Sequence, residues 1–225
     1  MKYKAIILKT VLFTFLITIL SCSNTNNSEA TTTLESKYVR LTSKYKDITF
    51  DSLEVYTTWD LDNEKFKYKG VSLDSIEVTY LPYNIKQWGV EHSFYACYKF
   101  KMNSTITALI TRVPSYYSSS AIKLFVYDTQ KDSIVKTLDL ADSWGDAGDA
   151  FQYATCIYQQ NNKDFLALAY TLSTYDHRAG GEPNDTIIDY WYDYSLTNIS
   201  KNPIDTITKD SATIVKKHKQ LPVFF

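Results

Sequence analysis

The stretch "FYACYKFKMNSTITALI", residues 94–110, decides the fold class of this 225-residue chain. Two runs of alternating aromatic, β-branched and polar residues flank a turn-forming Asn-Ser segment. This pattern is typical of two antiparallel strands joined by a short turn. Because side chains alternate along a strand, Phe94, Ala96, Tyr98 and Phe100 are predicted to share one face, and Tyr95, Cys97, Lys99 and Lys101 the other.

The same pattern of strand-forming runs and turn-forming residues continues on both sides of this stretch. Runs rich in Tyr, Phe, Ile, Val and Thr are separated by Asp, Asn, Gly and Ser, and with only 6 Gly and 5 Pro most turns must use Asn and Asp. We expect strands near 48–57, 65–69, 72–80, 93–102, 104–113, 121–128, 133–140, 151–160, 164–174, 186–194 and 204–215.

This succession of strands predicts an all-β fold, an antiparallel β-sandwich or open meander. A weak internal repeat leaves a second arrangement open. The segment "FQYATCIYQQNNKDFLALA", residues 151–169, has the same order of strand, turn and strand as residues 94–110. Four-stranded units of this kind resemble propeller blades, although the chain is short for a closed ring. A small or partial β-propeller is therefore the alternative.

A helix is expected before the first strands. In "TTLESKYVRLTSKYK", residues 32–46, the apolar residues Leu34, Tyr38, Leu41 and Tyr45 recur at helical spacing. Thr32 and Glu35 fit a capping box.

The N-terminal stretch "MKYKAIILKTVLFTFLITILSC", residues 1–22, has the form of an export signal. Three lysines precede an apolar run from Thr10 to Leu20, which is shorter than the about 20 residues of a membrane span. Its end, Ile19-Leu20-Ser21-Cys22, resembles the lipobox of bacterial lipoproteins. That resemblance implies cleavage before Cys22, acylation of its thiol, and anchorage in the cell envelope, with Ser23 favouring the outer membrane of a Gram-negative bacterium.

The domain organisation follows from this resemblance and from composition. We expect a signal peptide at 1–21, a lipidated flexible tether at 22–33 and a single mostly-β domain at 34–225. The tether is polar Ser, Asn and Thr, which cannot offset the entropy of ordering.

Charge and motifs exclude several function classes. The 24 basic and 25 acidic residues form no basic stripe, so no nucleic-acid partner is expected. No nucleophile elbow, zinc motif, phosphate loop or dinucleotide fingerprint occurs, so we assign no catalytic residue and no cofactor. The three histidines, His92, His177 and His218, lie in no catalytic pattern.

We consider two acidic stretches as metal ligands and two strand cysteines as a disulfide. The acidic stretches with Asp139, Asp142, Asp146 and Asp149, and with Asp60, Asp62 and Glu64, do not match an EF-hand loop, so we assign no metal site. Cys97 and Cys156 lie in strand-like runs, either as one disulfide or as two buried thiols.

The most distinctive strand is "DYWYDY", residues 189–194. Alternation sends Asp189, Trp191 and Asp193 to one face and Tyr190, Tyr192 and Tyr194 to the other. An exposed aromatic ring between carboxylates suits a sugar, whose apolar face packs on the ring while its hydroxyls donate to the acids. Asp189, Trp191 and Asp193 are thus candidate ligand-binding residues, the alternative being an amphipathic Trp at a sheet edge.

Triplets of Asp, then Ser or Thr, then an apolar residue occur more often than composition predicts. They resemble acceptor sites of the O-glycosylation system of one large Gram-negative phylum. The same triplets also suit turns that lead into strands. The candidate acceptors are Ser52, Ser75, Ser133, Thr186, Thr206 and Ser211.

These features together predict a non-catalytic envelope lipoprotein that binds a glycan or a partner protein and is held to the membrane by its lipid anchor. A secreted hydrolase acting on envelope or dietary polymers is the alternative.

Overall fold

The computed structural model describes residues 36–58, 60–83, 93–115, 120–161, 164–180, 187–201, 204–210 and 212–214. Residues 36–225 group into one unit and residues 1–35 into another. The helical elements are α2 (Lys37–Ser43), α3 (Ser75–Val78) and the 3-10 turn η1 (His177–Gly180). The strands are β1 (Lys46–Asp47), β2 (Ser52–Val55), β3 (Val71–Ser72), β4 (Tyr95–Lys101), β5 (Ile106–Val113), β6 (Ala121–Asp128), β7 (Ser133–Asp146), β8 (Asp149–Gln160), β9 (Asp164–Asp176), β10 (Ile188–Asn198) and β11 (Asp205–Thr208).

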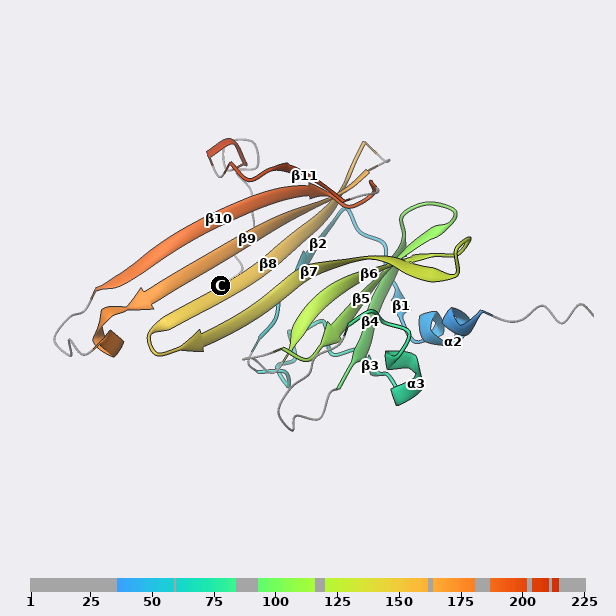
Figure 1. Cartoon of the computed structure of the whole chain (residues 1–225), viewed down its shortest axis with the longest axis horizontal. Helices are drawn as coiled ribbons and strands as arrows, with labels where there is room; N and C mark the ends of the chain where they lie inside the picture. The colour runs from blue at the N-terminus through green and yellow to red at the C-terminus, as the bar shows by residue number, and fades with distance from the viewer. Residues whose placement is uncertain are drawn as a thin grey trace, which may run out of the picture. The chain divides into compact units, whose positions relative to one another are not determined.

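The strands form one open sheet of 11 strands (Figure 1). Its main path runs β1-β4-β5-β6-β7-β8-β9-β10-β11, with β2 beside β8 and β3 beside β4. From β4 to β11 each strand pairs antiparallel with its neighbour in sequence, and β1 pairs with β4 in parallel. The all-β prediction is confirmed in its meander form, and the described strands are not divided into propeller blades.

The sheet curves until distant strands share one core. The Phe100 ring on β4 lies 5.0 Å from the Phe165 ring on β9. In a flat sheet these strands would be about 24 Å apart, five spacings of about 4.8 Å. The curvature therefore gives the meander the buried interior of a sandwich. Its core comprises Leu53, Val55, Phe66, Tyr68, Cys97, Phe100, Ala108, Ile110, Ile122, Leu124, Val126, Leu140, Ala141, Ile157, Phe165, Ala167 and Ile199.

A second core lies on the other face of β4–β6, under α2. Tyr38 and Leu41 of this helix are buried, and the Tyr38 ring stacks on Tyr127 at 4.7 Å. The helix prediction is confirmed over the described residues, where Ser36 is the N-cap and accepts from the Tyr38 amide. Leu34 and the predicted cap at Thr32 and Glu35 lie outside the described residues.

The strand expected at 72–80 is wrong over most of its length, because Ser75–Val78 form helix α3. Asp74 accepts hydrogen bonds from the Ile76 and Glu77 amides, and the Glu77 carboxylate accepts from the Asp74 amide. This capping box stabilises a helical turn despite the β-branched residues. Hydrogen bonds from the Glu77 and Ile76 amides, together with Arg40, hold the pKa of Asp74 below its usual range.

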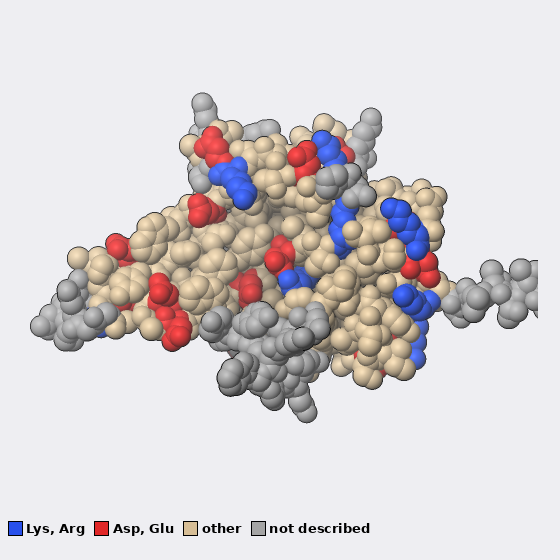
Figure 2. Space-filling view, in the orientation of Figure 1, with Lys and Arg blue, Asp and Glu red and all other residues tan. Residues whose placement is uncertain are grey.

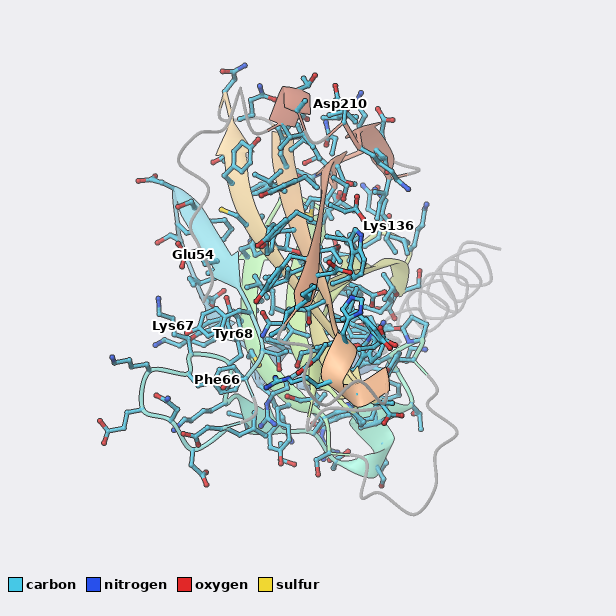
Figure 3. The ribbon with its side chains drawn as sticks, turned by 90° about the vertical axis from the view of Figure 1, so that its left-hand side faces the viewer. Glu54, Phe66, Lys67, Tyr68, Lys136 and Asp210 are labelled. Carbon is cyan, nitrogen blue, oxygen red and sulfur yellow. The ribbon has the colours of Figure 1, made fainter. Side chains whose placement is uncertain are left out.

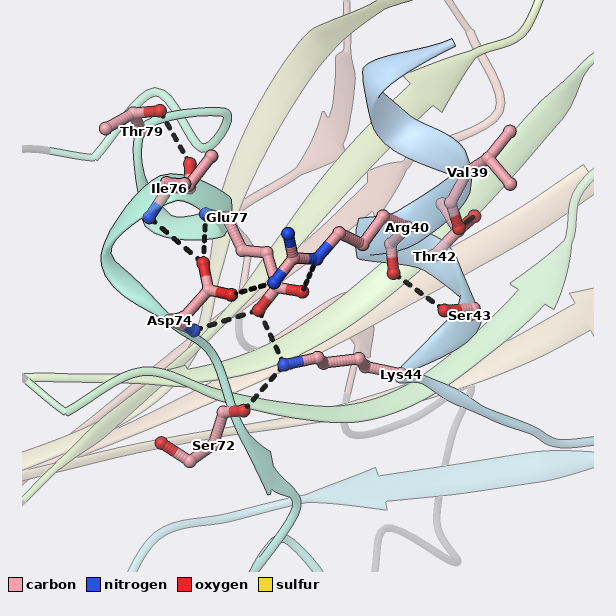
Figure 4. A network of polar contacts seen from close by, with 10 residues as sticks. All are labelled: Val39, Arg40, Thr42, Ser43, Lys44, Ser72, Asp74, Ile76, Glu77 and Thr79. Carbon is pink, nitrogen blue, oxygen red and sulfur yellow. Dashed lines mark hydrogen bonds and ion pairs between the residues drawn. The ribbon is translucent and has the colours of Figure 1, made fainter. Parts of the chain in front are cut away.

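The buried Glu77 also joins the two helices (Figure 4). Its side chain is fully buried and pairs with Lys44 at 2.7 Å and Arg40 at 3.3 Å. Burying a carboxylate is costly unless it is paired and hydrogen-bonded. These contacts therefore fix α3 against α2.

The strand expected at 65–69 is also wrong, since this segment is irregular. Phe66 and Tyr68 are nevertheless buried, and they lie beside β2, which carries Glu54 (Figure 3). The Arg112 guanidinium donates to the carbonyls of Tyr68 at 3.0 Å and Lys69 at 2.9 Å. A side chain thus satisfies backbone acceptors that a neighbouring strand would otherwise satisfy.

The predicted alternation in residues 94–101 fails at one point. Phe94 and Ala96 pack in the core under α2, whereas Cys97 and Phe100 pack in the larger core. The β4–β5 register shifts between Ala96 and Tyr98, which marks a β-bulge. One extra residue moves the following side chains to the opposite face.

The last strand is shorter than the predicted 204–215, because β11 ends at Thr208. The Asp210 side chain accepts from the Ala212 amide at 3.1 Å, and the Asp210 carbonyl accepts from the Ile214 amide at 3.0 Å. Ile214 is buried against Leu166, Leu168 and Leu196. A capped turn therefore replaces the end of the strand.

Candidate functional site

The ends of β7–β10 continue beyond the rest of the sheet (Figure 1). Past Ala141, β7 has left β6 and pairs only with β8. We call the paired segments 142–146, 149–153, 171–176 and 188–193 the four-stranded extension. In Figure 2 its visible surface is mostly uncharged, and the charged side chains on it are mainly acidic.

A two-residue turn closes the β7–β8 hairpin at the tip of the extension. Ala147 and Gly148 both have positive φ, +48° and +94°, as a type I′ turn requires. The acidic stretch around this turn is therefore strand on both sides of the turn, with Asp139, Asp142 and Asp146 on β7 and Asp149 on β8. No group of three or more metal-binding side chains occurs in the described part of the chain.

One face of the extension gathers aromatic and acidic side chains, and we call it the tryptophan face. Cross-strand pairing sets Trp144 opposite Phe151, Phe151 opposite Ser173, and Ser173 opposite Trp191. Two further rows flank these four residues, and they are Asp142, Tyr153, Thr171 and Asp193 on one side and Asp146, Asp149, Tyr175 and Asp189 on the other.

The central row has an aromatic residue at each end and a small residue between them. Trp144 stacks on Phe151 with ring centroids 5.9 Å apart, and the Trp191 side chain is 52 % exposed. Ser173 fills little of the space between Phe151 and Trp191, which lie two strand spacings, about 10 Å, apart. On the tryptophan face, the small Ser173 therefore leaves a step between Phe151 and Trp191.

Asp189 is held in place beside this surface. Its carboxylate lies 2.9 Å from Nε2 of His177, the first residue of η1. The His177 ring packs edge-on against Tyr175 at 5.0 Å. The neighbouring Arg178 does not contact Asp189 in this way. Its side chain forms an ion pair with Asp176 and holds the pKa of that carboxyl below its usual range.

The opposite face of the extension is the tyrosine face. It carries Tyr190, Tyr192 and Tyr194 of β10, as alternation predicts, because no register shift interrupts the β9–β10 pairing. Tyr190 and Tyr192 are exposed, and Tyr170 of β9 packs against Tyr192 at 5.9 Å and Tyr194 at 5.2 Å. Burial among these rings raises the pKa of Tyr170 to about 12.

The two strand cysteines are both free and buried, which is the second of the two arrangements left open by the sequence. Cys97 lies in the larger core, where its thiol contacts the Tyr68 carbonyl at 3.3 Å. Cys156 lies opposite Leu168 on the neighbouring strand β9. The next residue, Ile157, points into the larger core, so the Cys156 side chain lies on the other face of β8. The sheet backbone therefore separates the two thiols.

The glycosylation candidates lie at diverse places. Ser52 and Thr206 are exposed on β2 and β11, Ser75 is exposed at the start of α3, and Ser133 is half-buried at the start of β7. Thr186 and Ser211 lie outside the described residues. Asp74 and Asp210 of the triplets accept hydrogen bonds from the Ile76 and Ala212 amides, and Asp132 accepts from the Tyr127 hydroxyl, so these motifs have a structural use.

Sequence reasoning missed the partners of Trp191. Trp144 lies between the strands expected at 133–140 and 151–160, and Phe151 starts the second of them, so alternation within single strands did not place either residue beside the tryptophan. The signal available was "WGDAGDAF", residues 144–151, in which Ala-Gly marks the turn of a hairpin.

Cys22 and residues 1–35 lie outside the described residues. In the described ranges no helix is long and apolar enough to cross a membrane. No family model, curated protein or solved structure matches the chain.

Proposed function

We propose that this protein is a non-catalytic binding module of a bacterial cell envelope, and that its ligand is a neutral glycan held on the tryptophan face. The observation that carries the proposal is the register of Trp191 with Ser173, Phe151 and Trp144. The exposed Trp191 ring and the half-buried Phe151 and Trp144 rings in one row suit the apolar faces of successive sugar rings.

The charges of this face favour a neutral ligand. Asp142, Asp189 and Asp193 surround the aromatic row, and carboxylates accept hydrogen bonds from sugar hydroxyls. The same carboxylates repel sulfated or uronate polymers. A neutral polysaccharide is therefore the preferred class.

The lipid anchor is part of the same proposal. Acylation of Cys22 would hold the domain at the outer membrane through the tether of residues 22–33, because two or more acyl chains bind a bilayer durably. The Cys22→Ser variant, expressed in the native cell, is expected to leave the membrane fraction. Retention of this variant on membranes would contradict the anchor and leave the ligand proposal untouched.

Affinity electrophoresis and calorimetry with neutral polysaccharides test the ligand. Trp191→Ala is expected to weaken binding by about tenfold or more, as expected for loss of a central aromatic contact, while Trp191→Phe retains part of it. Tyr190→Ala is the matched control, since Tyr190 is 54 % exposed on the same strand but on the opposite face.

The outcomes are distinct. Equal binding by Trp191→Ala and the wild type would contradict the proposal. Release of soluble sugars during the same incubations would favour the alternative hydrolase, and loss of that release in a His177→Ala variant would assign it to this protein.

A partner protein is a second candidate ligand, and one observation favours it. β11 pairs only with Leu196–Asn198 of β10, so Ile188–Ser195 have no strand neighbour on that edge among the described residues. Such an edge can accept an added strand from another protein. Tyr192→Pro is expected to abolish capture of such a partner without weakening polysaccharide binding.

Glycosylation of the Asp-Ser and Asp-Thr triplets is a further proposal, supported by the exposure of Ser52, Ser75 and Thr206. Intact-mass measurement of protein purified from the native cell tests it. A mass equal to polypeptide plus acyl chains would contradict it.

A further inference from the structure

A hollow lies on the tyrosine face of the extension. It encloses about 360 Å³, and the residues that border it on this face are Ser143 and Gly145 of β7, Ala150 and Gln152 of β8, and Leu172 and Thr174 of β9. Trp144 and Phe151 also border it, although cross-strand pairing assigns their side chains to the tryptophan face. The hollow therefore shares Trp144 and Phe151 with the site proposed above, and its other six lining residues belong to the opposite face.

The small residues that open this hollow are not required by the backbone. Gly145 lies opposite Ala150, and it has no positive φ. A Cβ added at Gly145 would meet the Asp149 carbonyl at 3.4 Å and the Ala150 Cβ at 3.6 Å, which are ordinary contacts. A Cβ would fit there, so neither backbone strain nor crowding at this position explains the glycine.

A buried hydroxyl without a partner lies at the edge of the hollow. Ser143 is only 5 % exposed, and its hydroxyl has no hydrogen-bond partner among the described residues. Buried polar groups in folded proteins are nearly always hydrogen-bonded, so each exception needs an explanation. Ser143 and Gln152 also border a smaller cavity of about 40 Å³, so these two residues lie between the two spaces.

The lining defines the ligand chemistry. The hydroxyls of Ser143 and Thr174 and the amide of Gln152 donate and accept hydrogen bonds, and the lining contains no Lys, Arg or His. Asp142 borders the smaller cavity and accepts from the Ser115 hydroxyl and the Ser143 amide, both at 2.8 Å. Anionic ligands are disfavoured, whereas a molecule rich in hydroxyls can pair with every polar group.

The size of the hollow agrees with this chemistry. Its volume lies at the lower end of the range of small-molecule sites, about 300–1,000 Å³. Gly145, Ala150 and Leu172 supply an apolar surface for the carbon face of a ring. We propose that the hollow is a second binding site, which takes one or two rings of a neutral sugar or polyol, with Ser143 bonded to a ligand hydroxyl.

Saturation-transfer NMR and calorimetry with the methyl glycosides of neutral hexoses and of N-acetylglucosamine test this site, with methyl glucuronide as the charged control. The detergent-solubilised full-length protein is expected to bind at least one neutral glycoside and to bind the glucuronide more weakly. Absence of binding by every neutral glycoside at millimolar concentration would overturn the proposal.

Gly145→Val is the deciding variant, because it fills the hollow with a side chain that strands favour. It is expected to keep the thermal midpoint of the wild type and to weaken glycoside binding by about tenfold or more, as for a blocked pocket. Full binding by a folded Gly145→Val protein would overturn the proposal.

Ser143→Ala separates a ligand role from a structural one. Removing an unpaired buried hydroxyl should leave the unliganded protein at least as stable as the wild type. Glycoside binding should fall about fivefold, as for loss of one net hydrogen bond. Undiminished binding by Ser143→Ala would overturn the role of Ser143.

Trp191→Ala distinguishes the two sites. Under this proposal it leaves glycoside binding in the hollow unchanged. If Trp191→Ala abolishes binding and Gly145→Val does not, the hollow is overturned and the tryptophan face stands. If Gly145→Val abolishes glycoside binding and Trp191→Ala does not, the hollow is supported independently of the proposed function.

Discussion

Trp191 on β10 lies directly opposite Ser173 on β9, and Ser173 in turn lies opposite Phe151 on β8. The small serine therefore separates two aromatic side chains on one face of the sheet. This step gives the tryptophan face a shape that a row of large residues would not have.

Filling this step is expected to block the glycan site. In a Ser173→Tyr variant the new ring occupies the space between Phe151 and Trp191. We expect the affinity for polysaccharide to fall by about tenfold or more, as for a sterically blocked site. Stability should be retained because Tyr favours strands. Calorimetry checks the binding, and Thr137→Tyr, at an exposed position of β7 outside the four-stranded extension, is the matched control.

The β7–β8 turn predicts opposite effects for its two residues. Ala147 has φ +48°, which is unfavourable for a residue with a Cβ, so Ala147→Asn is expected to raise the free energy of unfolding by about 0.5 kcal/mol. In Gly148→Ala the new Cβ would lie 2.6 Å from the Ala179 Cβ and 2.8 Å from the Asp176 carbonyl oxygen. We expect a loss of about 2 kcal/mol, measured by urea unfolding.

The helix pair depends on Glu77. Removing its carboxylate in Glu77→Ala leaves the Asp74 amide without its acceptor and Lys44 with only the Ser72 carbonyl, as Figure 4 shows. We expect the free energy of unfolding to fall by about 2 kcal/mol, since the cap is lost and the freed Lys44 and Arg40 retain access to solvent. Glu64→Ala on an exposed turn is the control, and an equal loss there would contradict the assignment.

Asp142 predicts a pH dependence of stability. Burial raises the pKa of its carboxyl, although hydrogen bonds from Ser115 and the Ser143 amide oppose the shift. The native protein therefore holds this proton to a higher pH than the unfolded chain, and the resulting stability is lost as pH rises through the native pKa.

The asparagine in an Asp142→Asn variant cannot ionise, so this variant should not lose stability as pH rises through the native pKa of Asp142. Relative to the wild type, the variant is expected to gain stability between acidic and neutral pH, as measured by urea unfolding across that range. Asp60→Asn, on an exposed turn, controls for the loss of one carboxylate. A constant difference between Asp142→Asn and the wild type would contradict the prediction.

The buried thiols predict a labelling pattern. Burial raises the pKa of Cys97 to about 12 and that of Cys156 to about 11. Because the thiolate is the reactive form, neither should react with a maleimide in the folded Cys22→Ser protein at neutral pH. Both should react in urea without a reductant, as intact mass will show; labelling only after reduction would indicate a disulfide.

Several elements were predictable from the sequence because their signals are local. Alternation located β4, β5, β6, β8 and β9 within a few residues, and helical spacing located α2. The capping box Asp74–Glu77 was also a local signal, but Ile76, Val78 and Thr79 suggested a strand. Local hydrogen bonds determined that segment more strongly than β-propensity did.

Other features depend on contacts that no local pattern contains. The bulge near Cys97 reversed the faces of β4, and Arg112 replaced a strand neighbour for residues 68–69. Both exist because segments distant in sequence meet in the curved sheet.

The sequence by itself determined that Asp189, Trp191 and Asp193 share a face, since side-chain alternation is a property of any extended chain. Only the tertiary structure decided that Trp144, Phe151 and Ser173 join them, because cross-strand register depends on how strands about 20 residues apart align. The same alignment placed Gly145 opposite Ala150 and so opened the hollow on the other face.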